Sequence, residues 1–307
     1  MKRLLFLSFL FFTQTVFSQN EDSLDNARLS KMIQLSEVVV RNNMDVNAFI
    51  QRVKNDTTFY KAFRNLRVLS FTSMNDIRMK NKKGEVSASL QSKTRQHVAK
   101  SCRTMEILNE STTGDFYDKN RDYNYYTAEL YASLFFTKGQ ICGETNIVAG
   151  TQRDVKSKKG IEKNKEQLKM LFFDPGKKIP GIPLMGDKTA IFDKDHADRY
   201  DFSLDYVDYN GQSCYLFTIK AKSGTGVVID NMTTWFSSKS MEIVARNYDL
   251  SYDAGVYDFN VHMQVQMTQF GNLTVPSTLR YIGTWDVAFK KRERGVFTAT
   301  LSDFSRQ

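Results

Sequence analysis

The chain contains few of the residues on which low-complexity, disulfide-rich and metal-binding proteins depend. Its 307 residues include only 4 proline, 16 glycine, 3 cysteine and 3 histidine. So little proline and glycine excludes a collagen-like or low-complexity chain. His97, His196 and His262 are far apart and lack the paired spacing of zinc ligands. No two cysteines form a C-x-x-C motif, so neither zinc binding nor dithiol redox chemistry is indicated.

The sequence also lacks the motifs of common catalytic and nucleotide-binding sites. It contains no G-x-S-x-G, which excludes the usual nucleophile elbow of α/β hydrolases. The glycine turn at residues 223–226 lacks the lysine of a phosphate-binding loop. Pairs of acidic residues could serve a glycosidase, but their spacing singles out no pair. We therefore predict no cofactor, and we rank an enzyme last among three functional hypotheses.

Long apolar segments are absent except near the N-terminus. Residues 4–12 carry no charge, follow Lys2 and Arg3, and precede small residues at Val16 and Ser18. This order predicts a secretory signal peptide over residues 1–18, cleaved near Ser18; a buried N-terminal helix is the weaker alternative. The run is shorter than the roughly 20 residues of a transmembrane helix. We expect a mature chain without a transmembrane segment, periplasmic or secreted.

The formal net charge is +9, and it falls to +7 when Lys2 and Arg3 are removed with the signal peptide. A basic exported protein could meet anionic lipid or acidic polysaccharide, whereas export argues against nucleic acid as a partner. The densest basic tract could contact acidic headgroups, although a solvated helix face is the simpler interpretation. The tract comprises Lys156, Lys158, Lys159, Lys163, Lys165, Lys169, Lys177 and Lys178.

The three cysteines are Cys102, Cys142 and Cys214. Export permits disulfides, but an odd number leaves at least one cysteine outside an intramolecular pair. Cys102 and Cys142 could pair and leave Cys214 free. All three could equally be buried thiols, and the sequence leaves both arrangements open.

The sequence is rich in aromatic residues and in segments whose residues alternate with the period of two that is typical of strands. Aromatic residues make up 13% of the chain, which favours pleated surfaces. Alternation begins near residue 65 and continues in runs at 84–99 and 125–136. Beyond residue 200, long alternating runs are separated by short turns such as Asn210-Gly211, a strong hairpin signal. We predict a mainly β fold with few helices: a large curved antiparallel sheet or half-barrel in up-and-down order, with one apolar face.

The first 64 residues and one internal segment depart from this β pattern. After the signal peptide, residues 19–64 are expected to form a polar, mobile lead-in at 19–34, a short strand at 35–40 and helices. Residues 44–54 have the spacing of an amphipathic helix, capped by Asn43 or Asp45, and a second short helix follows.

The predicted β domain covers residues 65–307 and contains an insertion at 149–188. A basic helix is expected around 158–173 within this insertion, because Asp174-Pro175-Gly176 would end it. Such an insertion often lies over the edge or mouth of a sheet.

One polar segment, residues 193–198, contains candidate metal ligands. Asp193, Asp195, His196 and Asp198 could offer donors to Ca²⁺. No glycine permits the sharp turn of a helical calcium loop, and no glutamate closes it. We therefore favour a polar turn before the next strand and predict no metal.

The C-terminal third has a distinctive order of strands and turns. A strand ending in Asp230 precedes a hairpin to residues 241–246, a long strand at 259–270, a turn at Gly271 and a strand that opens around Pro276. This layout, with the N-terminal helix and the insertion, resembles the outer-membrane lipoprotein carrier and sorting superfamily. The resemblance implies half a β-barrel wrapped around helices, with a cavity for acyl chains. No catalytic motif defines that superfamily, so the likeness is one of layout.

The leading hypothesis is a non-enzymatic periplasmic binding or carrier-like protein, with a lipid or lipidated ligand in a hydrophobic concavity. Ordinary core packing accounts for the same apolar stripe, and is the commoner explanation for such residues. The second hypothesis is a structural or interaction module in a cell-envelope assembly, which would bind an envelope protein. The predicted lining residues are Leu171, Phe172, Ile179, Ile182, Phe259, Val261, Met263, Val265, Leu279, Tyr281 and Trp285.

Overall fold

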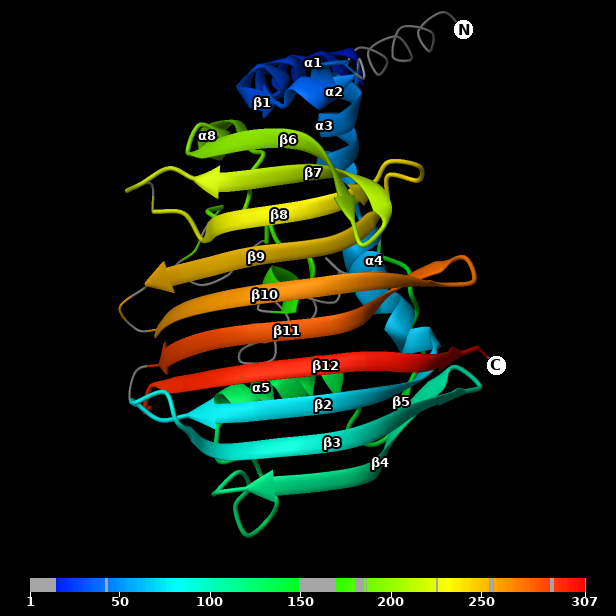
Figure 1. Cartoon of the computed structure of the whole chain (residues 1–307), viewed down its shortest axis with the longest axis vertical. Coiled ribbons are helices and arrows are strands. Elements are labelled where there is room, and N and C mark those ends of the chain that lie inside the picture. Colours follow the sequence, from blue (N-terminus) through cyan, green and yellow to red (C-terminus); the bar gives the residue numbers. More distant parts are fainter. Residues whose placement is uncertain are drawn as a thin grey trace, which may run out of the picture.

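The computed structural model describes residues 15–41, 44–148, 169–179, 185, 187–224, 226–253, 255, 257–287 and 290–306. Within this part of the chain the dominant feature is one twelve-stranded sheet (Figure 1). Its strands are β1 (Ile33–Leu35), β2 (Ser70–Lys80), β3 (Val86–Ala99), β4 (Cys102–Thr113), β5 (Ile141–Cys142), β6 (Tyr200–Tyr209), β7 (Gln212–Ala221), β8 (Ile229–Ser237), β9 (Ile243–Asp253), β10 (Tyr257–Phe270), β11 (Leu273–Val287) and β12 (Glu293–Ser305).

The strand order confirms the predicted up-and-down sheet. Strands β6 to β12 are neighbours in chain order, and each pairs antiparallel with the next. Strand β12 then pairs antiparallel with β2, so the last described strand lies beside the first long one in the same sheet. Strand β1 pairs parallel with β6, which makes the sheet mixed. The edge strands β1 and β5 do not pair with each other, so the sheet stays open.

The turn at Asn210-Gly211 forms the predicted hairpin between β6 and β7. Both residues have positive φ, 54° and 79°, as the favoured two-residue hairpin turns require. Asparagine and glycine tolerate this conformation better than other residues.

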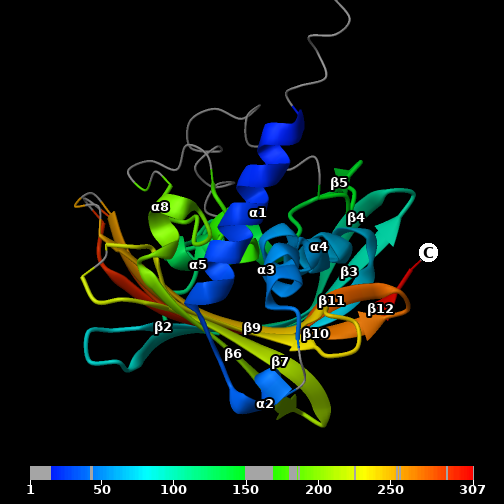
Figure 2. The same cartoon turned by 90° about the horizontal axis from the view of Figure 1, so that it is seen from above.

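The apolar face of the sheet is its concave face, which most of the helices cover (Figure 2). On β10, Phe259, Val261, Met263 and Val265 are buried, and each alternates with a more exposed polar residue. Because side chains alternate across a strand, this pattern aims one apolar row at the helices. The predicted curved β fold with few helices is confirmed.

Two helices on the concave side were also predicted correctly. Helix α3 (Val46–Asn55) begins at Asp45, whose side chain accepts a hydrogen bond of 3.0 Å from the backbone N–H of Ala48. This cap satisfies one of the free donors of the first turn. Helix α4 (Thr58–Asn65) follows and packs against β11.

The prediction of a mobile lead-in at residues 19–34 is wrong. Helix α1 (Thr15–Met32) covers most of this segment and packs against α3, and β1 follows it. Leu29 and Asn26 are buried, and Asn26 accepts a hydrogen bond of 3.1 Å from Lys54. The helix is held by these tertiary contacts, which its polar composition does not reveal.

The predicted strand at residues 35–40 is also wrong beyond its first residue. The ladder with β6 ends when the N–H of Ser36 donates to the carbonyl of Leu204, at 3.0 Å. The carbonyl of Ser36 then accepts from Val40 at 3.1 Å, which closes a turn of helix α2 (Glu37–Arg41). Without a continued pairing partner, β-branched valines do not keep the chain extended.

The third wrong prediction is the strand at residues 125–136, which forms helix α5 (Tyr126–Phe135). Apolar residues occur here at both helical and strand spacing, so periodicity alone could not decide. The carboxylate of Glu293 on β12 accepts the backbone N–H groups of Tyr126 and Thr127, at 3.1 and 2.8 Å. A carboxylate from a distant strand thus caps the helix, and no local pattern shows it.

The predicted insertion helix lies mostly outside the described residues. Residues 169–173 are helical, and the helix ends at Asp174, as the Asp174-Pro175-Gly176 signal predicts. Residues 158–168 are not among those described.

Candidate functional site: an apolar pocket with a cationic mouth

A pocket of about 660 Å³ lies between the concave face of the sheet and α4, the end of α5 and the segment 141–147. Its floor comes from inward positions of β2, β11 and β12, and its walls come from the helices. Just over half of the described lining residues are apolar: Phe63, Leu66, Phe71, Leu134, Phe135, Phe136, Ile141, Ile147, Met170, Phe173, Leu279, Ala299 and Leu301.

Strand pairing and ring packing fix the shape of the apolar floor. Leu279 and Ala299 face each other across β11 and β12 in the sheet register. Above them, the rings of Phe63 and Phe173 stack with centroids 4.4 Å apart, and Phe135 meets Phe173 edge-on at 5.9 Å. Rings packed against one another in this way keep an apolar wall in place without a ligand.

The pocket mouth is built from polar and charged side chains. Glu144 accepts from Arg67 at 2.9 Å and from the Nε of Arg103, so one carboxylate bridges two guanidinium groups. Arg103 also donates to Thr137, whose hydroxyl donates to Gln96 at 3.1 Å. Each of these side chains is half-buried or buried, so the network is partly shielded from water.

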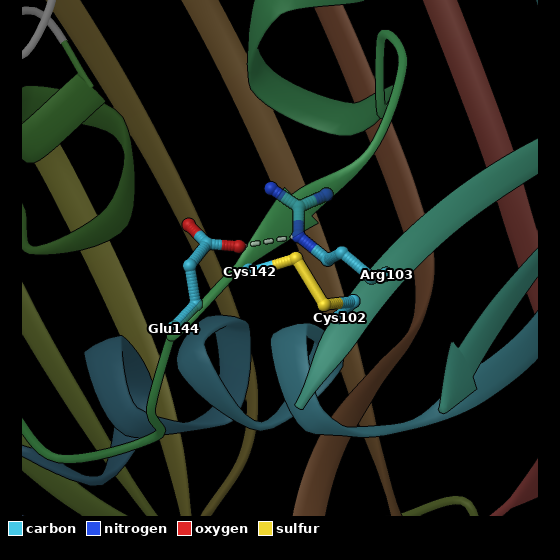
Figure 3. The surroundings of a disulfide bond; sticks show 4 residues. All are labelled: Cys102, Arg103, Cys142 and Glu144. Carbon is cyan, nitrogen blue, oxygen red and sulfur yellow. Dashed lines mark hydrogen bonds and ion pairs between the residues drawn. A yellow bond between two sulfur atoms is a disulfide. The ribbon is translucent and has the colours of Figure 1, made fainter. Parts of the chain in front are cut away.

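A disulfide between Cys102 and Cys142 holds this mouth together (Figure 3). It links the start of β4 to the end of β5, and so settles the pairing that the sequence left open. Arg103 follows Cys102 directly, and Glu144 comes two residues after Cys142, so the bridge brings their side chains together. Cys214 is a free, buried thiol.

The charges around Glu144 favour the ionised form of its carboxyl group. Burial opposes ionisation of Glu144, but the hydrogen bond from Arg103 and the charges of Arg67, Arg103 and Arg64 outweigh it and lower its pKa. The described lining residues include four cationic side chains, those of Arg64, Arg67, Arg103 and Lys169, and one carboxylate. Among the described lining residues, cationic side chains therefore outnumber carboxylates.

Arg64 is the most buried of these cations. Only 6% of its surface is exposed, and its Nε has no hydrogen-bond partner among the described residues. One terminal nitrogen donates to the carbonyl of Ile147 over a long 3.4 Å. A buried guanidinium with an unused N–H is costly unless something else accepts from it.

The residues predicted to line a concavity mostly form the core. Leu279 lines the pocket, whereas the other described candidates are buried in the same continuous core and are not among the pocket's described lining residues. Ile182 lies outside the described residues. The other described candidates are Leu171, Phe172, Ile179, Phe259, Val261, Met263, Val265, Tyr281 and Trp285.

The candidate metal ligands at residues 193–198 are spread around the short helix α8 (Lys194–Ala197). The Asp198 carboxylate accepts from Arg28, and the Nδ1 of His196 is buried with no hydrogen-bond partner in the described part of the chain. The described residues contain no group of three or more histidine, cysteine and acidic side chains placed to hold a metal.

Only three lysines of the basic tract, Lys169, Lys177 and Lys178, are among the described residues. Lys178 pairs with Asp187 at 2.8 Å, and Lys177 donates to the backbone carbonyls of Val53 and Lys54. Lys169 lines the pocket. The five lysines from 156 to 165 lie outside the described residues.

Sequence reasoning missed the charged mouth of the pocket. Arg64 and Arg67 stand in a helical segment where a solvent-facing role is the default, and Glu144 stands in a segment without regular structure. The available signal was the optional pairing of Cys102 with Cys142, which would have placed Arg103 near Glu144.

No known protein family and no curated protein matches this chain by sequence. Among solved structures it is similar to a DUF1329 family protein from Desulfovibrio piger, with 12% identity over 82% of this chain and 94% of the other, and a TM-score of 0.25. It is also similar to a putative outer membrane lipoprotein-sorting protein domain from Vibrio parahaemolyticus, with 9% identity over 80% and 89% of the chains and a TM-score of 0.29.

A third similar structure is that of lipovitellin, described for its lipid–protein interactions. Identity is 8%, the TM-score is 0.30, and the match covers 78% of this chain but 25% of lipovitellin. The layout of the sorting domain is of the kind that the sequence was predicted to resemble. Scores and identities this low concern layout alone and say nothing of a ligand. Within the described residues, no helix has both the length and the apolar character needed to cross a membrane.

Proposed function

We propose that this chain is a non-enzymatic, carrier-like binding protein that holds an acyl chain of a lipid or lipidated ligand in the pocket. The observation that carries the proposal is a cavity of about 660 Å³ whose floor is apolar and whose mouth is polar. This volume lies in the range of about 300–1,000 Å³ typical of small-molecule sites. An alkyl chain on the floor would gain about 0.8 kcal/mol for each methylene removed from water.

The predicted export fits the same role. A signal peptide over residues 1–18 would deliver the chain to the periplasm or the cell exterior, where free lipid and lipidated proteins need shielding from water. In this proposal Leu279 contacts the ligand. The other described lining candidates, such as Phe259 and Trp285, form the core that supports the curved sheet.

A chain-length series tests the proposal directly. Binding of saturated fatty acids of roughly eight to eighteen carbons should tighten about tenfold for every two added methylenes until the pocket is full. Affinity that does not depend on chain length would contradict a buried acyl chain. Calorimetry or displacement of a fluorescent fatty acid measures the series.

A matched pair of variants shows where the acyl chain binds within the protein. Ala299 lies on the pocket floor, so Ala299→Phe should fill it and weaken binding of long chains at least tenfold. Ala132→Phe adds the same ring to a half-buried position of α5 outside the pocket lining and should leave binding unchanged. An equal loss of affinity in both variants would mean that the acyl chain binds outside this pocket. Thermal melting shows whether each variant folds.

A second candidate function is an interaction module in a cell-envelope assembly. Strand β5 covers β4 only at Cys102 and Arg103, so the rest of β4 has no second strand among the described residues. Ile107 and Leu108 on this edge are 57% and 45% exposed. An open edge with exposed apolar residues can accept a strand from another protein. Loss of partner capture in Ile107→Lys, with fatty-acid binding intact, would favour this function.

A further inference from the structure

We propose that the pocket selects amphiphiles with an anionic head, and that Arg64 is the residue that determines this specificity. The inference rests on the proposed function, because it assigns the head of the ligand whose chain the apolar floor would hold. The chemistry required of the head is an oxyanion, either a carboxylate or a phosphate.

The first argument is the charge of the lining. Arg64, Arg67, Arg103 and Lys169 surround the pocket, and Glu144 is the one carboxylate among its described lining residues. Glu144 already bridges Arg67 and Arg103, so its charge is engaged at the mouth. Among the described lining residues, an anionic head would therefore meet three arginines and one carboxylate, which two of those arginines already share.

The second argument is the unused donor of Arg64. This side chain is 94% buried, from an exposed fraction of 6%, yet its Nε has no acceptor among the described residues. Buried polar groups are almost always hydrogen-bonded in folded proteins, and an exception needs an explanation. The Nε is enclosed by protein, so a ligand oxyanion would accept from this N–H once the guanidinium turns toward the pocket that Arg64 lines. Hydrogen bonds between charged groups are the stronger kind.

The third argument is that head and chain would sit in one continuous space. Arg64 lies on α4 one residue after Phe63, whose ring forms part of the apolar wall. A ligand with its oxyanion on Arg64 can therefore lay its chain along Phe63 and Phe173 toward Leu279 and Ala299. A neutral head would leave the Arg64 donor unsatisfied and gain only the apolar contact.

The test compares ligands that share one chain and differ in the head. A long-chain fatty acid, the matching fatty alcohol and the matching monoacyl phosphate are titrated into the full chain. We expect the acid or the phosphate to bind roughly tenfold or more tightly than the alcohol. The tighter of the two anions tells whether a carboxylate or a phosphate source is preferred.

The variant Arg64→Met should reduce the preference for the anion to about one while leaving alcohol binding within roughly twofold. Arg280→Met, on the exposed side of β11, is the matched control and should keep the preference. If Arg64→Met does not fold, the unmodified protein still tests the preference for an anionic head. Rising salt should weaken binding of the anion and leave binding of the alcohol unchanged.

The outcomes separate this inference from the proposed function. Equal affinity for acid, phosphate and alcohol would overturn the anionic specificity and leave acyl-chain binding in place. A preference that persists in Arg64→Met would overturn the role of Arg64. Failure of all three ligands to bind would instead contradict the proposed function itself.

Discussion

At the residue scale, the pocket mouth depends on a carboxylate shared between two guanidinium groups. Glu144 contacts Arg67 and Arg103, and only 21% of its side chain is exposed. Its pKa lies below the usual value of about 4.5, because the arginines outweigh the cost of burial. Ionised Glu144 therefore stabilises the folded state.

This argument predicts a pH-dependent cost of removing the charge. Glu144→Gln should lower the free energy of unfolding by about 1–3 kcal/mol at pH 7, because Arg67 and Arg103 lose their shared anion. A depressed folded pKa contributes stability above the unfolded pKa, and this contribution disappears as the pH falls through the folded value. Urea unfolding of both proteins at pH 7 and near pH 3 measures it. An equal difference at both pH values would contradict the account.

Asp174 should behave in the opposite way. Burial raises its pKa to about 6, against the lowering effect of Lys177 and Arg246. The folded state then binds more protons than the unfolded state between about pH 4 and pH 6, so stability falls as the pH rises through this window. The loss from this group is up to about 3 kcal/mol, at about 1.4 kcal/mol for each pKa unit. Asp174→Asn should remove that slope, and parallel unfolding curves for the two proteins across the window would refute it.

Gly283 on β11 is predicted to be intolerant of a side chain. A Cβ at this position would overlap the ring of Tyr281, which is fully buried against Tyr131 of α5. The hydroxyl of Tyr281 also accepts a hydrogen bond from the indole N–H of Trp285. Gly283→Ala should therefore lower the free energy of unfolding by about 2 kcal/mol or more. Gly295 of β12 pairs directly with Gly283 and is the matched control, since a Cβ there would meet Thr127 at an ordinary 3.4 Å. Equal effects of the two substitutions in thermal melting would show that the ring is free to move.

At the scale of elements, the disulfide joins the last long strand on one side of the sheet to its short edge strand. Cys102 and Cys142 enclose a separation of 40 residues, which includes α5. A bridge of this span stabilises the folded state by about 4 kcal/mol in the chain-entropy description. It also holds Arg103 and Glu144 at the pocket mouth (Figure 3).

Replacing both bridged cysteines should therefore affect stability and binding together. The double variant Cys102→Ser, Cys142→Ser is expected to lose about 2–4 kcal/mol of unfolding free energy and to bind a fatty acid more weakly. Cys214→Ala, at the free thiol, is the control and should retain the affinity. Undiminished affinity in a folded double variant would mean that the bridge does not organise the mouth.

Strands were more predictable from the sequence than helices, for a physical reason. Alternation on β10 and β11 is decided by one buried and one solvated face, a pattern that is visible in the chain itself. Helix α5 depends on Glu293, more than 150 residues away, and α1 depends on α3. The burial of Arg64 was not predictable for the same reason, because segments distant in sequence enclose it, whereas the contact of Arg103 with Glu144 followed only if Cys102 was paired with Cys142.

At the scale of the whole molecule, one open curved sheet surrounds a set of helices (Figures 1 and 2). The pairing of β12 with β2 brings an early strand beside the last one, so Phe71 of β2 and Leu279 of β11 line the same pocket. Helices α4 and α5 lie on the concave side and leave the pocket between themselves and the sheet. The curvature of the sheet thus creates the apolar space that the proposed function uses.

The most direct test of this account is mass spectrometry of lipid extracted from the purified full chain. We predict acidic amphiphiles with a long acyl chain, at close to one molecule for each protein, and their depletion in Ala299→Phe but not in Ala132→Phe. Several independent preparations without any such lipid, combined with no binding of added fatty acid, would contradict the central claim that the pocket holds an acyl chain.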